Sequence, residues 1–394
     1  MNRREFIKSS SLASMAFMMP DFLKPFQRFA PEGYRNLVIV QLSGANDGLN
    51  TVVPFQNDLY YQARKNIMIP ATDVLKISDQ AGLHPVMKGF QELYNEGLLS
   101  IINSVGYPEP NRSHFRSMDI WETASASNEY LNTGWIGRYL DSACDECDHP
   151  YLALDLSEPL SLALKGNTKK GIAINNPKQL FNQTREPFFQ QLNNHALEHE
   201  NENVSYLYKT IAETSSSAKY IYETSKLYTN SYTYPDHPLA KQLQQIATFI
   251  ASGLKTRVYY ASMGGFDKHV NQLNRQEKLL TELSESVTAF VRNLKSNNQF
   301  NDTTVMIFSE FGRRVEQNAS GGTDHGTANN VFIISPSLKK QGLYNGMADL
   351  NNLDDGDLKY TVDFRSIYNT LLNKWLNVDI NGIIKPELGV LDFL

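Results

Sequence analysis

The sequence predicts an α/β fold with a mostly parallel central sheet, helices on both faces and one helical insertion. Apolar runs of strand length alternate with segments whose apolar residues have helical spacing, along most of the chain. This alternation is typical of a parallel sheet covered by helices on both faces. Several apolar runs also end close to a carboxylate, which is how α/β enzymes place site residues at the carboxyl edge of a sheet.

The first part of the chain begins with an expected strand over residues 36–42, where the apolar run is continuous. A turn rich in Gly, Asn and Asp follows and contains Asp47. Helical spacing over residues 89–97 leads to a second expected strand over 98–105. A loop then precedes a helix that we expect to begin near His114.

The second part differs at first in composition. Residues about 150–235 are rich in Asn, Gln, Tyr, Ser and Thr, so we expect a mostly helical insertion or cap there. The alternation then resumes, and it predicts a helix from Pro238, a strand over 256–262, a helix over 273–295, a strand over 303–309 and a helix over 363–376.

The N-terminus is typical of a twin-arginine export signal. An Arg-Arg pair at positions 3 and 4 precedes an aromatic residue, a lysine and a short apolar stretch. That stretch is about a dozen residues long, whereas a bilayer span needs about 20. We therefore expect 1–30 to be a signal peptide that the twin-arginine translocase recognises. The mature chain, 31–394, is expected to be one domain, periplasmic or secreted, with no stable membrane insertion.

Charge and cysteine usage narrow the classes of partner. The formal net charge is -5 and the chain has no basic run, which disfavours nucleic acid as a partner. Cys144 and Cys147 form a lone C-x-x-C motif. In an exported protein a local disulfide is the simplest interpretation, because a zinc site would need two further ligands from elsewhere.

Three expected strands are followed closely by acids, and these acids are Asp47, Asp267 and Glu310. The carboxyl ends of parallel strands lie on one edge, so the three carboxylates can converge. The loops beyond the strands add further candidate ligands, namely His269, Asp324 and His325. Carboxylates and imidazoles together suit Zn or Mn, and a set dominated by oxygen suits Mg or Ca. We expect one or two divalent metals at this edge.

Each candidate ligand also has a purely structural alternative. Asp47 could stabilise its own Asn-Asp-Gly turn. Glu310 could form a surface ion pair with Arg313 or Arg314, which would contribute little to stability. The joint occurrence of these residues near successive strand ends is what favours a metal site.

The expected helix near His114 offers a candidate nucleophile. Ser113 stands at its start, where the helix dipole and unpaired N–H groups favour a bound anion. Arg112 and Arg116 flank this serine and could contact an oxyanion. His114 is a candidate ligand or base. A helix-capping role alone is an equal alternative for Ser113.

Several motifs together resemble a known family. They are the Arg-Arg leader, SGANDGLNTVVP, NRSHF, GGFDKH, SEFGR and GTDHG. The combination resembles the exported bacterial proteins grouped as domain of unknown function 1501, which are placed in the alkaline phosphatase-like superfamily beside sulfatases and phosphomutases. The resemblance spans nearly the whole chain. It implies a bimetallic α/β fold in which a Ser or Thr at a helix start is the nucleophile.

The resemblance also implies roles for single residues. Asp47 would be the first-strand ligand, Ser113 the nucleophile, Asp267 and His269 ligands of the other metal, and His325 the late histidine. Two departures stand out. One residue separates Asp267 from His269 where the superfamily has three, and Phe311 follows Glu310 where a histidine is expected.

These observations predict an exported, metal-dependent hydrolase of phosphate or sulfate esters, acting on a small-molecule or glycan ester. The alternative is a non-catalytic metal-binding or glycan-binding protein of the same fold. A metal-free serine hydrolase is a weaker interpretation, because the sequence lacks a G-x-S-x-G motif.

Overall fold

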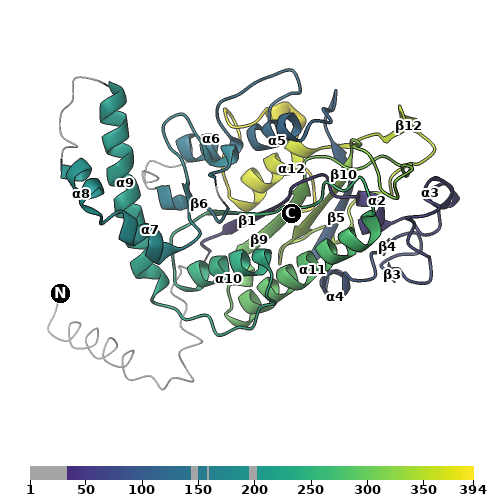
Figure 1. Cartoon of the computed structure of the whole chain (residues 1–394), viewed down its shortest axis with the longest axis horizontal. Helices are drawn as coiled ribbons and strands as arrows, with labels where there is room; N and C mark the ends of the chain where they lie inside the picture. Colours follow the sequence, from purple (N-terminus) through teal and green to yellow (C-terminus); the bar gives the residue numbers. More distant parts are fainter. Residues whose placement is uncertain (1–32, 143–149, 158, 195–201) are drawn as a thin grey trace.

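The computed structural model describes residues 33–142, 150–157, 159–194 and 202–394 (Figure 1). The signal peptide expected over 1–30 lies outside the described residues. The disulfide expected between Cys144 and Cys147 also lies outside them.

One large sheet forms the centre of the described chain. Its strands are β1 (Asn36–Leu42), β5 (Leu99–Gly106), β6 (Ala153–Asp155), β7 (Ile172–Ala173), β8 (Val258–Met263), β9 (Thr303–Ser309), β10 (Asn329–Ile334), β11 (Gly342–Leu343) and β14 (Val362–Asp363). The order across the sheet is β11-β5-β10-β9-β1-β8-β6-β7, with β14 beside β5. Within this sheet β10 alone runs antiparallel to its neighbours. The predicted α/β fold with a mostly parallel sheet is therefore confirmed.

Helices cover both faces of this sheet. They are α4 (Lys88–Asn95), α5 (His114–Thr123), α6 (Trp135–Ser142), α10 (Pro238–Ala251), α11 (Gln272–Ser296) and α12 (Phe364–Thr370), the last continued by the π-helical turn η5 (Leu371–Trp375). In Figure 1, α10, α11 and α4 lie below the sheet, and α5, α6 and α12 lie above it. Each face carries its own buried apolar cluster.

The strand side chains explain why both faces are covered. In β1, Val38 and Val40 join the cluster under α10 and α11, and Leu37 and Ile39 join the cluster under α5 and α12. Successive strand residues point to opposite faces, so a strand that is apolar at every position needs a helix layer on each side.

Small elements complete the chain. A three-stranded sheet contains β2 (Val52–Val53), β3 (Leu75–Lys76) and β4 (Gly82–Leu83), and a hairpin pairs β12 (Leu353–Asp354) with β13 (Asp357–Leu358). Two short helices, α2 (Gly48–Thr51) and α3 (Asp58–Ala63), lie in the same early segment as β2. Among the helices of the described residues, none has both the length and the apolar character needed to cross a membrane.

The range 150–235 contains helices, as expected, and also two short strands that were not expected. Strands β6 and β7 belong to the central sheet, and β6 pairs in parallel with β8. The helices of this range are α7 (Pro177–Gln183), α8 (Pro187–Asn194) and α9 (Glu202–Ser225). Two strands of three and two residues are too short to show an alternating pattern in the sequence, which is why they were not expected.

Candidate metal centre

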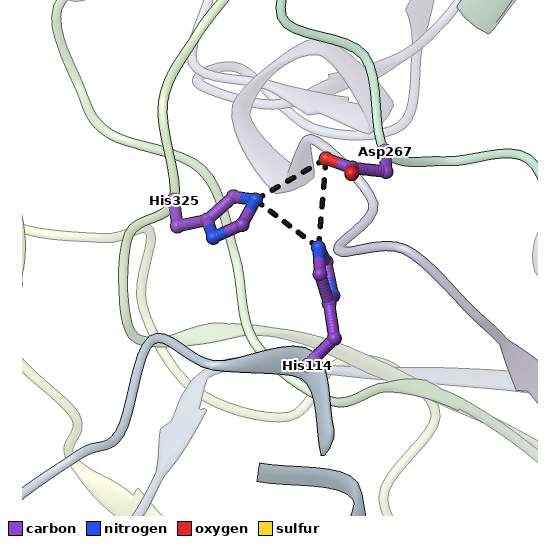
Figure 2. A group of neighbouring side chains, drawn as sticks. All are labelled: His114, Asp267 and His325. Atoms are coloured by element: carbon purple, nitrogen blue, oxygen red, sulfur yellow. Dashed lines mark hydrogen bonds and ion pairs between the residues drawn. The ribbon is translucent and has the colours of Figure 1, made fainter. Parts of the chain in front are cut away.

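The loops at the carboxyl edge of the sheet bring three side chains together. His114 begins α5 after β5, Asp267 follows β8, and His325 lies in the segment between β9 and β10. One ligand atom from each lies within 4.8 Å of the others, and this is the one such group found among the described residues. Figure 2 shows the three side chains pointing toward one another from separate segments.

The distances between these atoms match those around a small cation. Nε2 of His114 is 3.1 Å from Nε2 of His325, and Oδ1 of Asp267 is 3.5 Å and 3.2 Å from these two atoms. Zinc bonds to nitrogen or oxygen are about 2.0–2.1 Å, which sets neighbouring ligands in a tetrahedron about 3.3 Å apart. The three edges fit one face of that tetrahedron.

His269 lies against the same group. Its Nε2 is 2.9 Å from Oδ1 of Asp267 and 3.1 Å from Nε2 of His325. It does not belong to the group whose ligand atoms all lie within 4.8 Å of one another. Asp267 and His325 therefore form an edge shared by His114 on one side and His269 on the other.

Each of the three histidines has a partner for its outer nitrogen. Nδ1 of His114 is 2.7 Å from a Glu310 oxygen, and Nδ1 of His325 is 2.9 Å from the carbonyl oxygen of Arg112. Nδ1 of His269 is 3.3 Å from Asp324. Carbonyl and carboxylate oxygens accept hydrogen bonds here, so these Nδ1 atoms carry hydrogen. Metal-binding histidines usually have such a partner, which fixes the ring and its tautomer.

The Nδ1–H tautomers of the histidines leave their Nε2 lone pairs close to the Asp267 carboxylate. In neutral rings with hydrogen on Nδ1, each Nε2 presents a lone pair. The Nε2 lone pairs of His114 and His325 and the Asp267 oxygen all lie within 4.8 Å of one another, and they repel one another unless a cation or a proton lies between them. The donor set therefore fits a divalent cation, and its nitrogen content favours Zn or Mn over Ca or Mg.

Arg313 holds the loops around this centre. Its guanidinium is buried and donates to the carbonyls of Gly44, Ala45, Phe266 and Thr323, which lie on three separate loops. It also donates to Oδ1 of Asp267 at 2.9 Å. Partial burial tends to raise the pKa of Asp267, but the hydrogen bond and the positive charge of Arg313 oppose it, and the pKa lies well below its ordinary value. Asp267 is therefore an anion at neutral pH.

The turn after β1 reaches the same place through a glycine. Gly44 has a φ of 113°, and a Cβ there would lie 2.4 Å from the backbone nitrogen of Asp267. Only glycine allows both the positive φ and this close approach. The turn after β1 can therefore pack directly against the loop that carries Asp267.

Glu310 is fully buried beneath His114. One carboxylate oxygen accepts from the backbone N–H of Gly44 and faces Nδ1 of His114, and the other accepts from the Ser309 hydroxyl. Its contacts make it a partner that orients a histidine. The alternative of a surface pair with Arg313 or Arg314 is excluded by its burial.

Asp47 has a full set of partners of its own. Its oxygens accept from the backbone N–H of Asn50, from the guanidinium of Arg64 at 2.5 Å and from the side chain of Gln272. Arg64 has no exposed side-chain surface. A buried ion pair of this kind is costly to break from one side, about 3–5 kcal/mol, because the remaining charge has no partner. Asp47 also caps α2, so the structural role considered for it is present.

The residues around Ser113 are placed in different ways. Ser113 is exposed at the start of α5, and its side chain makes no capping hydrogen bond. The guanidinium of Arg112 contacts Asp357, and that of Arg116 donates to the carbonyls of Ser127 and Glu129. The described contacts of Arg116 include none with the histidine cluster.

Sequence reasoning gave two residues less weight than the structure does. Arg313 was considered only as a surface partner, and Arg64 was not singled out. A signal for Arg313 existed, because arginine directly beyond a strand that ends at a carboxylate lies where several loops meet. No comparable signal marked Arg64, which lies 17 residues from its partner Asp47.

Replacing Glu310 by glutamine is expected to weaken zinc binding about 10- to 100-fold, the usual range for a partner of a metal-binding histidine. The hydrogen bond to Glu310 is the largest cause of the raised pKa of His114. Protons therefore compete with zinc for this ring up to a higher pH than usual. The zinc affinity should rise with pH and become constant once the pH exceeds the pKa of His114. In Glu310→Gln that pKa falls, so the affinity should level off at a lower pH.

Zinc titrations of wild type and Glu310→Gln at a series of pH values between about 5 and 9 measure this shift. Identical pH profiles for the two proteins would show that His114 is not a ligand.

The comparisons with known proteins agree on a family. A model of a protein family of unknown function, DUF1501, matches residues 95–344, which include the loops that carry His114, Asp267 and His325. A search of curated proteins finds no match.

Solved structures similar to this chain have low sequence identity to it. The lipoteichoic acid synthase LtaP from Listeria monocytogenes is 9% identical with a TM-score of 0.41, covering 92% of this chain and 78% of its own. The phosphonate monoester hydrolase from Silicibacter pomeroyi is 8% identical with a TM-score of 0.41, covering 88% and 74%. The soluble domain of lipooligosaccharide phosphoethanolamine transferase A from Neisseria meningitidis is 9% identical with a TM-score of 0.43, covering 93% and 95%.

The family match spans well over half of the sequence and includes the NRSHF, GGFDKH, SEFGR and GTDHG motifs. It confirms the resemblance stated from those motifs. The chain belongs to the family of proteins of unknown function DUF1501.

Proposed function

We propose that the protein is a metal-dependent hydrolase of phosphate or sulfate esters. The observation that carries this proposal is the group of His114, His325 and Asp267, whose ligand atoms lie within 4.8 Å of one another while the outer nitrogen of each ring is hydrogen-bonded. Such a set is suited to hold a cation that in turn holds an anionic ester. We also propose that the chain is exported by the twin-arginine translocase, on the basis of its leader sequence.

His114, Asp267 and His325 would hold the ion, and His269, which lies against Asp267 and His325, is the nearest further donor. A divalent cation bound there would act as a Lewis acid on an oxygen of the phosphate or sulfate group. Glu310, Asp324 and the Arg112 carbonyl keep the three rings in their ligand tautomers. Asp47 is engaged by Arg64, so we propose one well-formed metal position instead of two.

Ser113 is the proposed nucleophile. Its Oγ would bond to the phosphorus or sulfur while the bond to the leaving alcohol oxygen breaks, and the serine proton would pass to that oxygen. Water would then release phosphate or sulfate and restore the hydroxyl. The first turn of α5 has unpaired N–H groups that favour the anion, and Arg112 adds a half-exposed cation. Arg116 is held by its own loop and is left out of this role.

A non-catalytic metal-binding protein of the same fold is the second candidate. The contacts of Asp47 favour it, because a carboxylate that already accepts from Arg64, Gln272 and Asn50 has little capacity for a metal. This candidate keeps the histidine centre and loses turnover.

Removal of the metal tests the proposal. The mature protein, purified with zinc or manganese, is expected to hydrolyse esters from a phosphate and sulfate library, to lose this activity after chelation, and to regain it when the ion is restored. Activity that is equal in a verified metal-free sample would contradict the metal-dependent function. A protein that binds zinc tightly and hydrolyses none of the esters would favour the second candidate.

A further inference from the structure

A cavity of about 360 Å³ lies directly beside the histidine centre. Glu310 and Phe311 line it from the segment after β9, and the loop from Gly106 to Pro110 lines another side. Glu310 therefore contacts both the cavity and His114. A volume of this size is at the lower end of the range for small-molecule sites and suits one or two rings.

Aromatic side chains form much of the cavity wall. Tyr107, Trp121, Phe311 and Tyr360 all line it. Trp121 is fixed between Phe308 and Phe364, with ring centroids 4.9 Å and 4.3 Å away. Both faces of Trp121 are thus covered, whereas Tyr360 is partly exposed and offers ring surface to a flat or ring-shaped group. Rigid side chains lose little freedom when a ligand binds.

Phe311 separates the cavity from the metal centre. Its ring stacks on His114, with centroids 4.9 Å apart, and it lies 5.1 Å from the ring of His325. Phe311 therefore gives the cavity an apolar wall on the side of the two histidines.

The polar groups of the cavity indicate which organic group fits. Glu109, Asp354 and Glu310 bring negative charge, and Lys359 is the cation among the lining residues. This excess of acid disfavours a second anionic group on the ligand. Carboxylates accept hydrogen bonds from hydroxyl groups. Trp121 also has a buried indole N–H with no partner among the described residues. This N–H could donate a hydrogen bond to an oxygen of the ligand.

We propose that this cavity binds the uncharged, hydroxyl-bearing ring of the substrate, with the ester group directed past Phe311 to the histidine centre. The position of the ester group in this inference rests on the proposed function. The binding of the ring rests on the cavity alone. Phenols and sugars are both uncharged rings that bear hydroxyl groups, and the experiment below distinguishes these two classes of ligand.

The test uses Tyr360, which is 38% exposed at the cavity wall and therefore replaceable without loss of the core. The metal-loaded protein is titrated with phenol and, separately, with methyl glucoside, and binding is measured by calorimetry or by NMR line broadening. We expect at least one of the two to bind. Tyr360→Ala should weaken that binding about tenfold, as loss of one stacked ring does, and Tyr360→Phe should stay within about twofold of wild type.

Kinetics and metal content separate this inference from the proposed function. In an active protein, the ratio of kcat/KM for 4-hydroxyphenyl phosphate to that for methyl phosphate should fall about tenfold in Tyr360→Ala at wild-type metal content. Binding of neither ring to wild type, or equal binding to wild type and Tyr360→Ala, overturns the cavity assignment even when hydrolysis is present. Ring binding that depends on Tyr360 in a protein without hydrolysis supports the cavity and contradicts the proposed hydrolase.

Discussion

His325→Ala should reduce zinc affinity by more than about 100-fold, a larger loss than is usual for partners that only orient a ligand. The reason is the central place of this ring, whose Nε2 lies 3.1 Å from both His114 and His269 and 3.2 Å from Asp267. Its removal leaves the remaining donors without the atom that connects them. Metal content after dialysis and calorimetric titration with zinc measure the loss.

The matched control is His237→Ala. His237 precedes α10 and pairs with Glu285 at 3.1 Å, on an element that supplies no residue to the histidine cluster. It should retain wild-type zinc affinity, which separates loss of a specific ligand from loss of any histidine. If His325→Ala binds zinc as tightly as the control, the centre described here does not hold the ion.

Much of the fold could be predicted because the large strands are apolar throughout. The strands expected over 36–42 and 303–309 match β1 and β9 residue for residue. Strand β10 was not predicted, and neither was its antiparallel direction, which depends on pairing with β5 and β9 and leaves no local pattern. The short strands β6 and β7 were missed for a different reason, namely their length.

The candidate site could be predicted only in part. Asp267 was placed at this edge because it follows a strand closely, and His269 and His325 because they lie in the loops beyond the strands; the structure brings the three together. His114 was considered as a ligand or a base, and the sequence could not decide between these roles, because its position depends on the direction in which α5 leaves β5. The partner of Asp47 was not predicted, since a buried arginine on a distant loop leaves no periodic signal. Acids that precede a turn can cap a helix or bind an ion, and only packing decides between the two.

Ser113→Ala should lower hydrolysis by at least about 10³-fold, equivalent to about 4 kcal/mol in the activation free energy, and leave zinc content unchanged. The serine lies next to His114 in sequence, at the first turn of α5, and its hydroxyl makes no capping hydrogen bond. Its backbone N–H donates to Asn111, so the alanine variant keeps the local backbone contacts. A serine used only as a cap would accept a hydrogen bond from a backbone N–H of the first helical turn through its hydroxyl oxygen.

The control variant is Ser337→Ala, which removes an exposed hydroxyl after β10. Turnover numbers and zinc content are measured for both variants and for wild type. Since helix stability owes nothing to a Ser113 capping bond, thermal unfolding of Ser113→Ala should match that of wild type. Full activity in Ser113→Ala would transfer the attacking role to water at the histidine centre. Reduced activity together with reduced zinc would instead assign Ser113 to the integrity of the site, because its neighbour His114 depends on the start of α5 for its position.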